Sequence, residues 1–286
     1  MACAARTMAA LGGICCAAFL FSPIQIGMLA LAAAACALAM PRRRMAAIEV
    51  LAGLAFMAFM FGPAGAGGFA LMHALGAAPL LVSAPRARSI FALTVTTALA
   101  ATLSVCAATF LSEMAPTRWA PFAPMAPAFM LAAPALVVRR LGRATGGPVR
   151  AQARRLNALG PLLVALVVGA GVDGLHGAAV GWAGAQLAIP LTTLLRERHR
   201  ASLAPLALGV LAAGFVATLA TGAALGFAGG APLAAAPAMM VGVIVFTLAL
   251  RVHAPAAARH LERGLARLIP NVTVDRGPSR TPDAAT

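Results

Sequence analysis

Long apolar runs separated by short clusters of arginine make up most of this chain. Most of these runs exceed the roughly 20 residues that one helix needs to cross a bilayer, and each holds a glycine, proline or polar break. We therefore predict an all-α, polytopic integral membrane protein of about ten transmembrane helices, paired in five short hairpins. The predicted hairpins span residues 8–40, 46–83, 89–138, 156–195 and 202–250.

The breaks inside the runs predict where the chain turns. Proline removes a helical hydrogen bond, and clustered glycines favour turns, so a short helix is expected on each side of every break. The third break is a polar connector whose tryptophan is expected at the membrane interface. The breaks are Ser22-Pro23, residues 62–68, the connector with Glu113, Arg118 and Trp119, residues 171–174 and residues 226–232.

The arginines fall on one side of the predicted arrangement. Apart from the five histidines, every basic residue is arginine, and of the 22 arginines only Arg118 lies in a turn on the opposite side. Short loops rich in positive charge resist translocation, so both termini are predicted to be cytoplasmic. Arginine without lysine, together with the absence of tyrosine, is typical of a GC-rich bacterial source, which points to the bacterial inner membrane.

The segment 139–155 is the predicted internal boundary because it is the longest polar stretch between apolar runs and holds six arginines. It separates transmembrane helices 1–6, in residues 1–138, from transmembrane helices 7–10, in residues 156–250. Residues 251–286 are predicted to form a cytoplasmic tail.

The composition excludes a water-soluble globule. Hydrophobic residues make up 62% of the chain and charged residues 10%, with a mean hydropathy of +0.92, so polar side chains are too few to cover a soluble surface. The net charge of +15 lies in short loops and not along a continuous face, so nucleic acid is not an expected partner.

Signatures of membrane enzymes and of metal sites are missing from the sequence. It contains no HExxH, GxSxG or Walker-type pattern, and the five cysteines form no CxxC pair or Cys/His cluster with metal-ligand spacing. We therefore expect no enzymatic activity, no cofactor and no bound metal.

Polar residues inside the apolar runs are the candidate functional residues because burying them in a bilayer is costly. His73 either exchanges a proton or hydrogen-bonds a neighbouring helix, and Gln186 either holds a substrate carboxylate or joins two helices. Thr97 either contacts substrate or serves close helix packing. Glu49 either lies deep enough to carry a proton or sits in the headgroup region beside Arg44.

Two further polar residues, Asp173 and His176, fall in a predicted outward turn. They are expected to be solvated and are the next candidates for proton coupling if His73 and Glu49 fail.

One segment resembles a known family. The proteins of the fusaric acid resistance or aromatic acid exporter group have a helix that begins with tryptophan, then a basic turn and a glycine-containing helix. The resemblance covers about one third of the chain, mostly residues 178–224, and implies proton-driven export of small, often aromatic, carboxylic acids. The residues that carry it are Trp182-Ala183-Gly184-Ala185-Gln186, Arg196, Ser202, Gly209 and Gly214.

The function expected from these observations is an inner-membrane secondary transporter that exports small organic acids, aromatic ones among them, coupled to protons. His73, Gln186 and Thr97 are the expected substrate-binding residues, and Glu49 and His73 the expected proton carriers. Partners are the lipid bilayer, a small organic anion and, in a homo-oligomer, further copies of the chain.

The alternative from another class is a non-transporting membrane subunit or scaffold of a larger complex. A transporter needs a polar cavity that reaches the bilayer midplane, whereas a scaffold does not.

The arginine asymmetry makes a testable prediction about topology. Reporter fusions should place the arginine-rich loops in the cytoplasm, because these loops resist translocation. An external location for the loop at 139–155 would contradict the predicted order of helices. The loops to be tested are residues 42–44, 86–88, 139–155, 196–200 and the tail after 250.

Overall fold

The computed structural model describes residues 9, 12–14, 16–40, 44–77, 90–113, 116–141, 148–196, 203–230 and 232–266. These residues are helical nearly throughout and contain no strand, which confirms the all-α class. The elements are α2 (Pro23–Leu38), α3 (Arg44–Ala77), α5 (Ile90–Glu113), η2 (Thr117–Met125), α6 (Ala126–Leu131), α7 (Ala133–Leu141), α8 (Pro148–Arg196), α9 (Leu203–Phe227), η4 (Pro232–Ala234), α10 (Ala235–His253) and α11 (Pro255–Ala266).

Six helical segments among the described residues are long and apolar enough to cross a membrane, which confirms a multi-pass membrane protein. The predicted count of about ten spanning helices is not supported. That count treated the stretch before Ser22, α2, and each part of α3 and of α8 as separate spans. With 16 residues, α2 reaches only ~24 Å, which is short of a hydrocarbon core of about 30 Å.

Large apolar side chains point outward from these segments. In a water-soluble protein such a surface would aggregate or bind a partner, whereas lipid chains cover it without cost. This surface supports contact with the bilayer. Examples exposed by more than half are Phe59, Val172, Phe215, Phe227 and Leu233.

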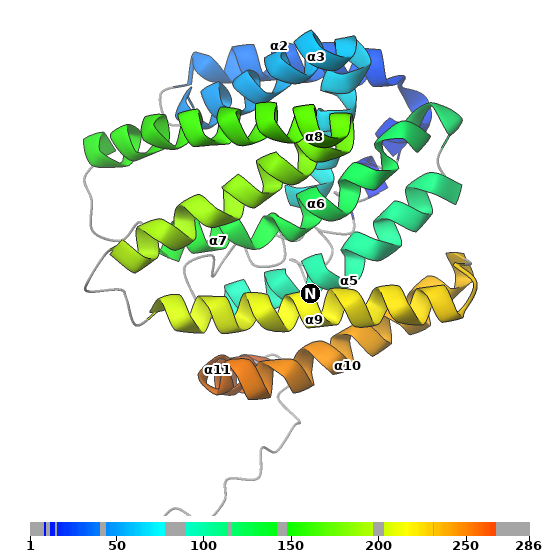
Figure 1. The fold of residues 1–286 in the computed structure, drawn as a ribbon, viewed down its shortest axis with the longest axis vertical. Helices are drawn as coiled ribbons and strands as arrows, with labels where there is room; N and C mark the ends of the chain where they lie inside the picture. Colours follow the sequence, from blue (N-terminus) through cyan, green and yellow to red (C-terminus); the bar gives the residue numbers. More distant parts are fainter. Residues whose placement is uncertain are drawn as a thin grey trace, which may run out of the picture.

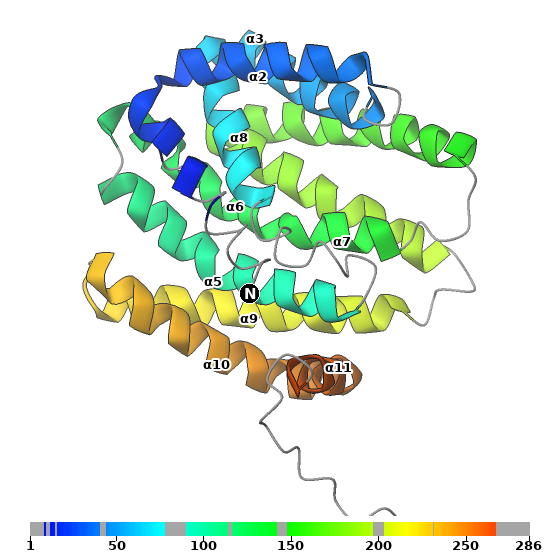
Figure 2. The same cartoon turned by 180° about the vertical axis from the view of Figure 1, so that it is seen from behind.

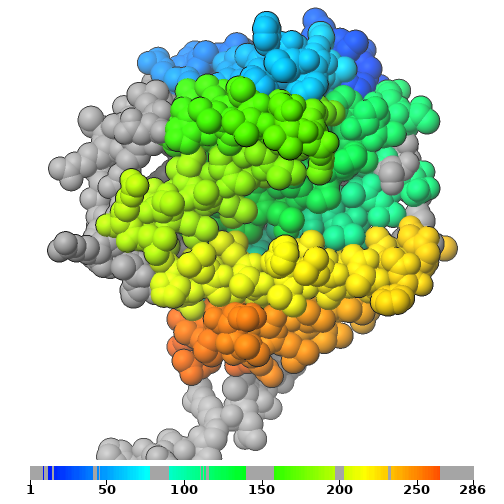
Figure 3. All heavy atoms as spheres, in the orientation of Figure 1, coloured from blue at the N-terminus to red at the C-terminus, as the bar shows by residue number. Residues whose placement is uncertain are grey.

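The helices stack along the long axis of the molecule, with α2 and α3 at one end and α10 and α11 at the other (Figures 1 and 2). The space-filling view shows α8 and α9 side by side on one face, with α10 and α11 beyond α9 (Figure 3). Two apolar cores hold the stack together. One joins α3, η2, α6 and α8 around Phe69 and Trp182, and the other joins α5, α9, α10 and α11 around Leu93 and Phe246.

The predicted break at Ser22-Pro23 is the start of α2. The Ser22 backbone N–H donates to Gln25 Oε1 at 2.8 Å, and the Gln25 backbone N–H donates to Ser22 Oγ at 3.3 Å. This reciprocal capping box satisfies two donors that a helix start leaves free, and Pro23 suits the first helical position because it has no N–H to lose.

α3 folds back on itself at Gly62, inside the predicted turn of residues 62–68. Gly62 has φ +72°, which a residue with a side chain rarely adopts, and Pro63 then starts the second part of the helix. Gly53 and Phe69, eight residues before and after Phe61, face each other so closely that a Cβ on Gly53 would lie 2.6 Å from the ring. Residues that lie the same number of positions before and after Phe61 in the sequence therefore face each other across the two parts of α3.

α8 makes a tighter hairpin at the predicted turn of residues 171–174. Asp173 and Gly174 leave helical geometry, and Gly174 has φ +50°. The two parts of α8 then pack backbone against backbone, because a Cβ on Gly169 would lie 2.0 Å from the carbonyl oxygen of Gly177. Small residues at this crossing allow the close approach that apolar helices need in a membrane.

The segment Thr117–Arg139 is the least regular of the six apolar spans. It consists of the 3₁₀ helix η2, the short helix α6 and the helix α7, which begins after a turn at Ala132. Prolines inside it, among them Pro121 and Pro134, remove backbone donors and prevent one continuous α-helix. The sequence predicted a connector that holds Arg118 and Trp119, followed by one transmembrane helix up to residue 138.

Trp119, expected at the membrane interface, is instead fully buried at the start of this segment. Its indole N–H donates to the Ala18 carbonyl at 2.6 Å, and the Arg118 guanidinium donates to the carbonyls of Ala18 and Phe19. These carbonyls lie at the end of the helical segment before Ser22 and lack helical partners, so the two side chains cap that helix end.

The α8 hairpin generates a prediction about stability. Gly177→Ala would place a Cβ 2.1 Å from the Gly169 carbonyl oxygen, so we expect it to cost about 1–3 kcal/mol through overpacking. Gly184→Ala is the matched control, because it has the same helix preference but meets no atom within 4 Å. Thermal unfolding in detergent should show a lower midpoint for Gly177→Ala alone; equal midpoints would contradict the close packing of the hairpin.

Candidate functional site

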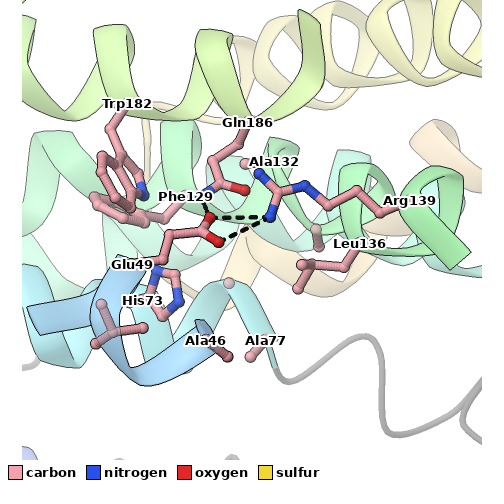
Figure 4. Close-up of a pocket in the computed structure, with 13 residues that line it drawn as sticks. Ala46, Glu49, His73, Ala77, Phe129, Ala132, Leu136, Arg139, Trp182 and Gln186 are labelled. Carbon is pink, nitrogen blue, oxygen red and sulfur yellow. Dashed lines mark hydrogen bonds and ion pairs between the residues drawn. The ribbon is translucent and has the colours of Figure 1, made fainter. Parts of the chain in front are cut away.

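A cavity of about 280 Å³ lies between α3, the α6–α7 segment and α8. Glu49 and His73 come from the two parts of α3, Arg139 from α7, and Trp182 and Gln186 from the second part of α8 (Figure 4). The fold-back of α3 explains the first pair, because Glu49 and His73 lie twelve residues before and after Phe61. Segments far apart in the sequence thus supply the polar groups of one cavity.

The centre of the site is an ion pair between Glu49 and Arg139. Arg139 Nη1 donates to Glu49 Oε1 at 2.9 Å and to Oε2 at 3.2 Å, and Gln186 Nε2 donates to Oε1 at 2.7 Å. Only 13% of the Arg139 side chain and 15% of the Glu49 side chain are exposed. At this depth each charge depends on the other, because burying a single charge in an apolar bundle is very costly.

Aromatic rings form the opposite side of the cavity. The His73 ring stacks on Phe69 with centroids 5.8 Å apart and meets Phe129 edge-on at 5.9 Å. The ring of Phe69 in turn contacts Trp182 edge-on at 5.4 Å. Phe129 and Trp182 both line the cavity, so it offers a flat apolar wall beside a charged group.

Two buried donors of this site have no hydrogen-bond partner within the part of the chain that the structure describes. They are Arg139 Nη2 and the indole nitrogen of Trp182, whose side chain is 1% exposed. An unsatisfied buried donor costs about 1–3 kcal/mol, and donors at functional sites remain unsatisfied when a ligand or water supplies the acceptor. The cavity therefore offers N–H groups to an acceptor.

Three of the four predicted site residues, Glu49, His73 and Gln186, line this one cavity. For Glu49 the structure identifies the ionic partner. Its partner is Arg139 and not Arg44, whose Nε donates to the Leu38 carbonyl at 3.0 Å. For Gln186 the geometry matches the joining of two helices, because its amide donates to the carboxylate of Glu49 and so connects α8 to α3. Its contact with a substrate carboxylate stays a prediction.

The fourth predicted residue, Thr97, does not line this cavity, so the structure does not bring it together with the other three. Its hydroxyl donates to the Leu93 carbonyl at 2.8 Å, and its methyl group lies against Gly214. A Cβ on Gly214 would approach that methyl group to 2.4 Å. Thr97 therefore serves the close packing of α5 on α9, the other explanation that the sequence allowed.

Asp173 and His176 lie at the α8 turn, away from the cavity. Their side chains contact each other at 2.7 Å between Asp173 Oδ2 and His176 Nδ1, and both are about half exposed or more. They are exposed, and their solvation at an outward turn stays a prediction.

Sequence reasoning missed Arg139 and the indole N–H of Trp182 as parts of the site. Arg139 was assigned to the cytoplasmic loop that begins at that residue, but α7 continues to Leu141 and carries Arg139 into the cavity. The position of Arg139 in the sequence gave a signal, because this residue directly follows an apolar run. If the helix continues for one more turn, its side chain can point inward.

Among the described residues, no group of three His, Cys, Asp or Glu side chains could hold a metal ion. Comparison with protein-family models, with curated proteins and with solved structures finds no match to this chain.

The ion pair generates a prediction about stability. Arg139→Gln leaves the Glu49 carboxylate without its partner, so we expect a loss of about 3–5 kcal/mol. The double variant with Glu49→Gln should recover much of this loss, because no charge then remains. Thermal unfolding of both variants in detergent measures the difference.

The control is Arg251→Gln, which breaks an exposed pair with Glu262 at 3.1 Å. It should cost about 1 kcal/mol or less, because water replaces the lost partner. A similar small loss for Arg139→Gln would show that the buried pair contributes no more than a surface pair.

Proposed function

We propose that this protein is a secondary transporter that exports small organic acids across the membrane, coupled to protons. The observation that carries the proposal is the cavity at Glu49, Arg139 and Gln186, a charged and hydrogen-bonded site enclosed by apolar membrane spans. Ionisable groups inside a bundle are costly, and they are retained where a polar solute or a proton is bound.

The chemistry of the cavity favours an organic anion. Its guanidinium and indole N–H groups donate, and they suit a carboxylate as acceptor. The volume of about 280 Å³ is at the small end of ligand pockets, so the acid is small. Phe129 and Trp182 provide a flat wall for an aromatic ring.

The resemblance to aromatic acid exporters supports the same substrate class. Two of the residues that carry it, Trp182 and Gln186, line the cavity. We propose membership of that group on this ground.

The helices around the cavity are broken, as substrate-binding helices of transporters often are. The turn at Ala132 lies at the cavity wall, between α6 and α7. The fold-back at Gly62 separates the two parts of α3 that carry Glu49 and His73. Breaks at these places let the walls of the site move relative to each other without unfolding a whole span.

The depth of the cavity favours access from one side. Glu49 is the fourth residue of the span Ala46–Ala77, and Arg139 is the last residue of the span Thr117–Arg139. The charged pair therefore lies toward the span ends that precede or follow the arginine-rich loops. We propose that this side is cytoplasmic, so that the acid to be exported is bound from the cell interior.

A scaffold remains the alternative function, and a transport experiment separates the two. Purified protein in lipid vesicles should move members of a panel of aromatic acids when a pH gradient is imposed, faster than in protein-free vesicles. Glu49→Gln and His73→Ala should each abolish this pH-driven movement while leaving folded protein in the membrane, because each removes a titratable group of the cavity.

Thr97→Val is the matched control, because Thr97 is buried outside the cavity, and it should retain transport. Full pH-driven movement in both cavity variants would place the coupling group elsewhere. Failure of the unaltered protein to move any acid in the panel would leave the scaffold as the better description.

A further inference from the structure

The two terminal nitrogens of the Arg139 guanidinium differ in their hydrogen bonding. Nη1 serves both carboxylate oxygens of Glu49, whereas Nη2 is buried and has no partner within the part of the chain that the structure describes. A guanidinium has donors for two acceptors in one plane, and a second carboxylate could bind Nη2 without displacing Glu49 from Nη1.

A second unused donor lies at the same cavity. The Trp182 indole nitrogen is fully buried and also lacks a partner among the described residues. Figure 4 shows this nitrogen on the side of the ring that faces Glu49 and Gln186. These two buried donors, on α7 and α8, thus belong to residues that line the same cavity, and neither has a partner among the described residues.

These two donors indicate where an anion binds and which group takes up a proton with it. We propose that Arg139 Nη2 and the Trp182 indole N–H receive the carboxylate of the transported acid, and that Glu49 takes up one proton when this second carboxylate binds. The proposal rests on the proposed transport function and adds how the proton is coupled to the anion.

The charges of the cavity explain why the proton accompanies the anion. Among the residues that the structure describes, the titratable or charged side chains that face it are Glu49 and His73 from α3 and Arg139 from α7, while α6 contributes apolar groups and α8 the neutral Trp182 and Gln186. The empty site holds one carboxylate and one guanidinium. A second carboxylate would leave one negative charge in excess among apolar helices, and two carboxylates that share one site retain a proton between them.

Glu49 is the group that takes this proton because it already shares the guanidinium with the incoming anion. Gln186 Nε2 can continue to donate to Oε1 when Glu49 is neutral, so the side chain keeps its position. His73 stacks on Phe69 and meets Phe129 edge-on, and it belongs to the aromatic wall of the cavity.

The consequence for transport is electroneutral movement of acid and proton together. Both the empty site and the loaded site balance their charges, so both can reorient across an apolar barrier. Each exported anion then carries one proton outward, so export is driven by the concentration of the acid inside the cell and runs against an inward proton gradient.

Calorimetry on the full-length protein in lipid nanodiscs tests this inference, with benzoate as the probe. The dependence of the binding enthalpy on the ionisation enthalpy of the buffer gives the number of protons taken up. We expect about one proton per benzoate bound, and therefore a Kd that rises about tenfold for each pH unit above neutrality. In Glu49→Gln, which is neutral at every pH, proton uptake should vanish and Kd should no longer change with pH.

Asp173→Asn is the matched control, a carboxylate-to-amide change at the exposed α8 turn, and it should keep the proton uptake. Benzoate binding to the unaltered protein without proton uptake would overturn the inference and leave the proposed function standing. Uptake that persists in Glu49→Gln and is lost in His73→Gln would overturn it in favour of His73. Absence of benzoate binding to folded, unaltered protein would count against the proposed function itself.

Discussion

The buried ion pair of Glu49 and Arg139 constrains how α3, α7 and α8 pack against one another. In a bilayer no water solvates an ionisable side chain, so its partner has to come from the protein. The pair joins residues 90 positions apart, and the hydrogen bond from Gln186 to Glu49 spans 137 positions, so three apolar spans are fixed in register at one point. Apolar helices slide against lipid and each other at little cost, whereas this polar contact allows one arrangement.

Two hairpins make that contact possible. The fold-back of α3 at Gly62 returns the chain so that His73 meets the same cavity as Glu49, and the close glycine crossing of α8 sets the position of the part that carries Trp182 and Gln186. Both depend on glycine, for a positive φ in one case and for contact without a side chain in the other. The polar site therefore depends on residues that take no part in its chemistry.

The sequence predicted the class of the fold and the places where the chain turns, because apolar length and glycine or proline breaks are local signals. It pointed to three residues that line the cavity, since Glu49, His73 and Gln186 are rare polar groups in apolar runs. It also named Thr97, which lies outside the cavity and whose hydroxyl donates within its own helix. It overcounted the spans because a break does not reveal whether each part is long enough. Arg139 was missed because its role depends on where α7 ends and on Glu49, a residue 90 positions away.

The position of the charged pair near the ends of its spans suits a coupling site. At the centre of the bilayer an ion pair would be sealed from water, and a proton could reach it only through a chain of further polar groups. At the surface the pair would be screened, and binding a second carboxylate would cost little charge energy. Glu49 and Arg139 are each exposed by about one seventh, so water can deliver a proton while the apolar surroundings still make an unbalanced charge costly. Partial burial therefore gives the pair both properties that the proposed coupling of a proton to an anion requires, which are access to water and a high cost of unbalanced charge.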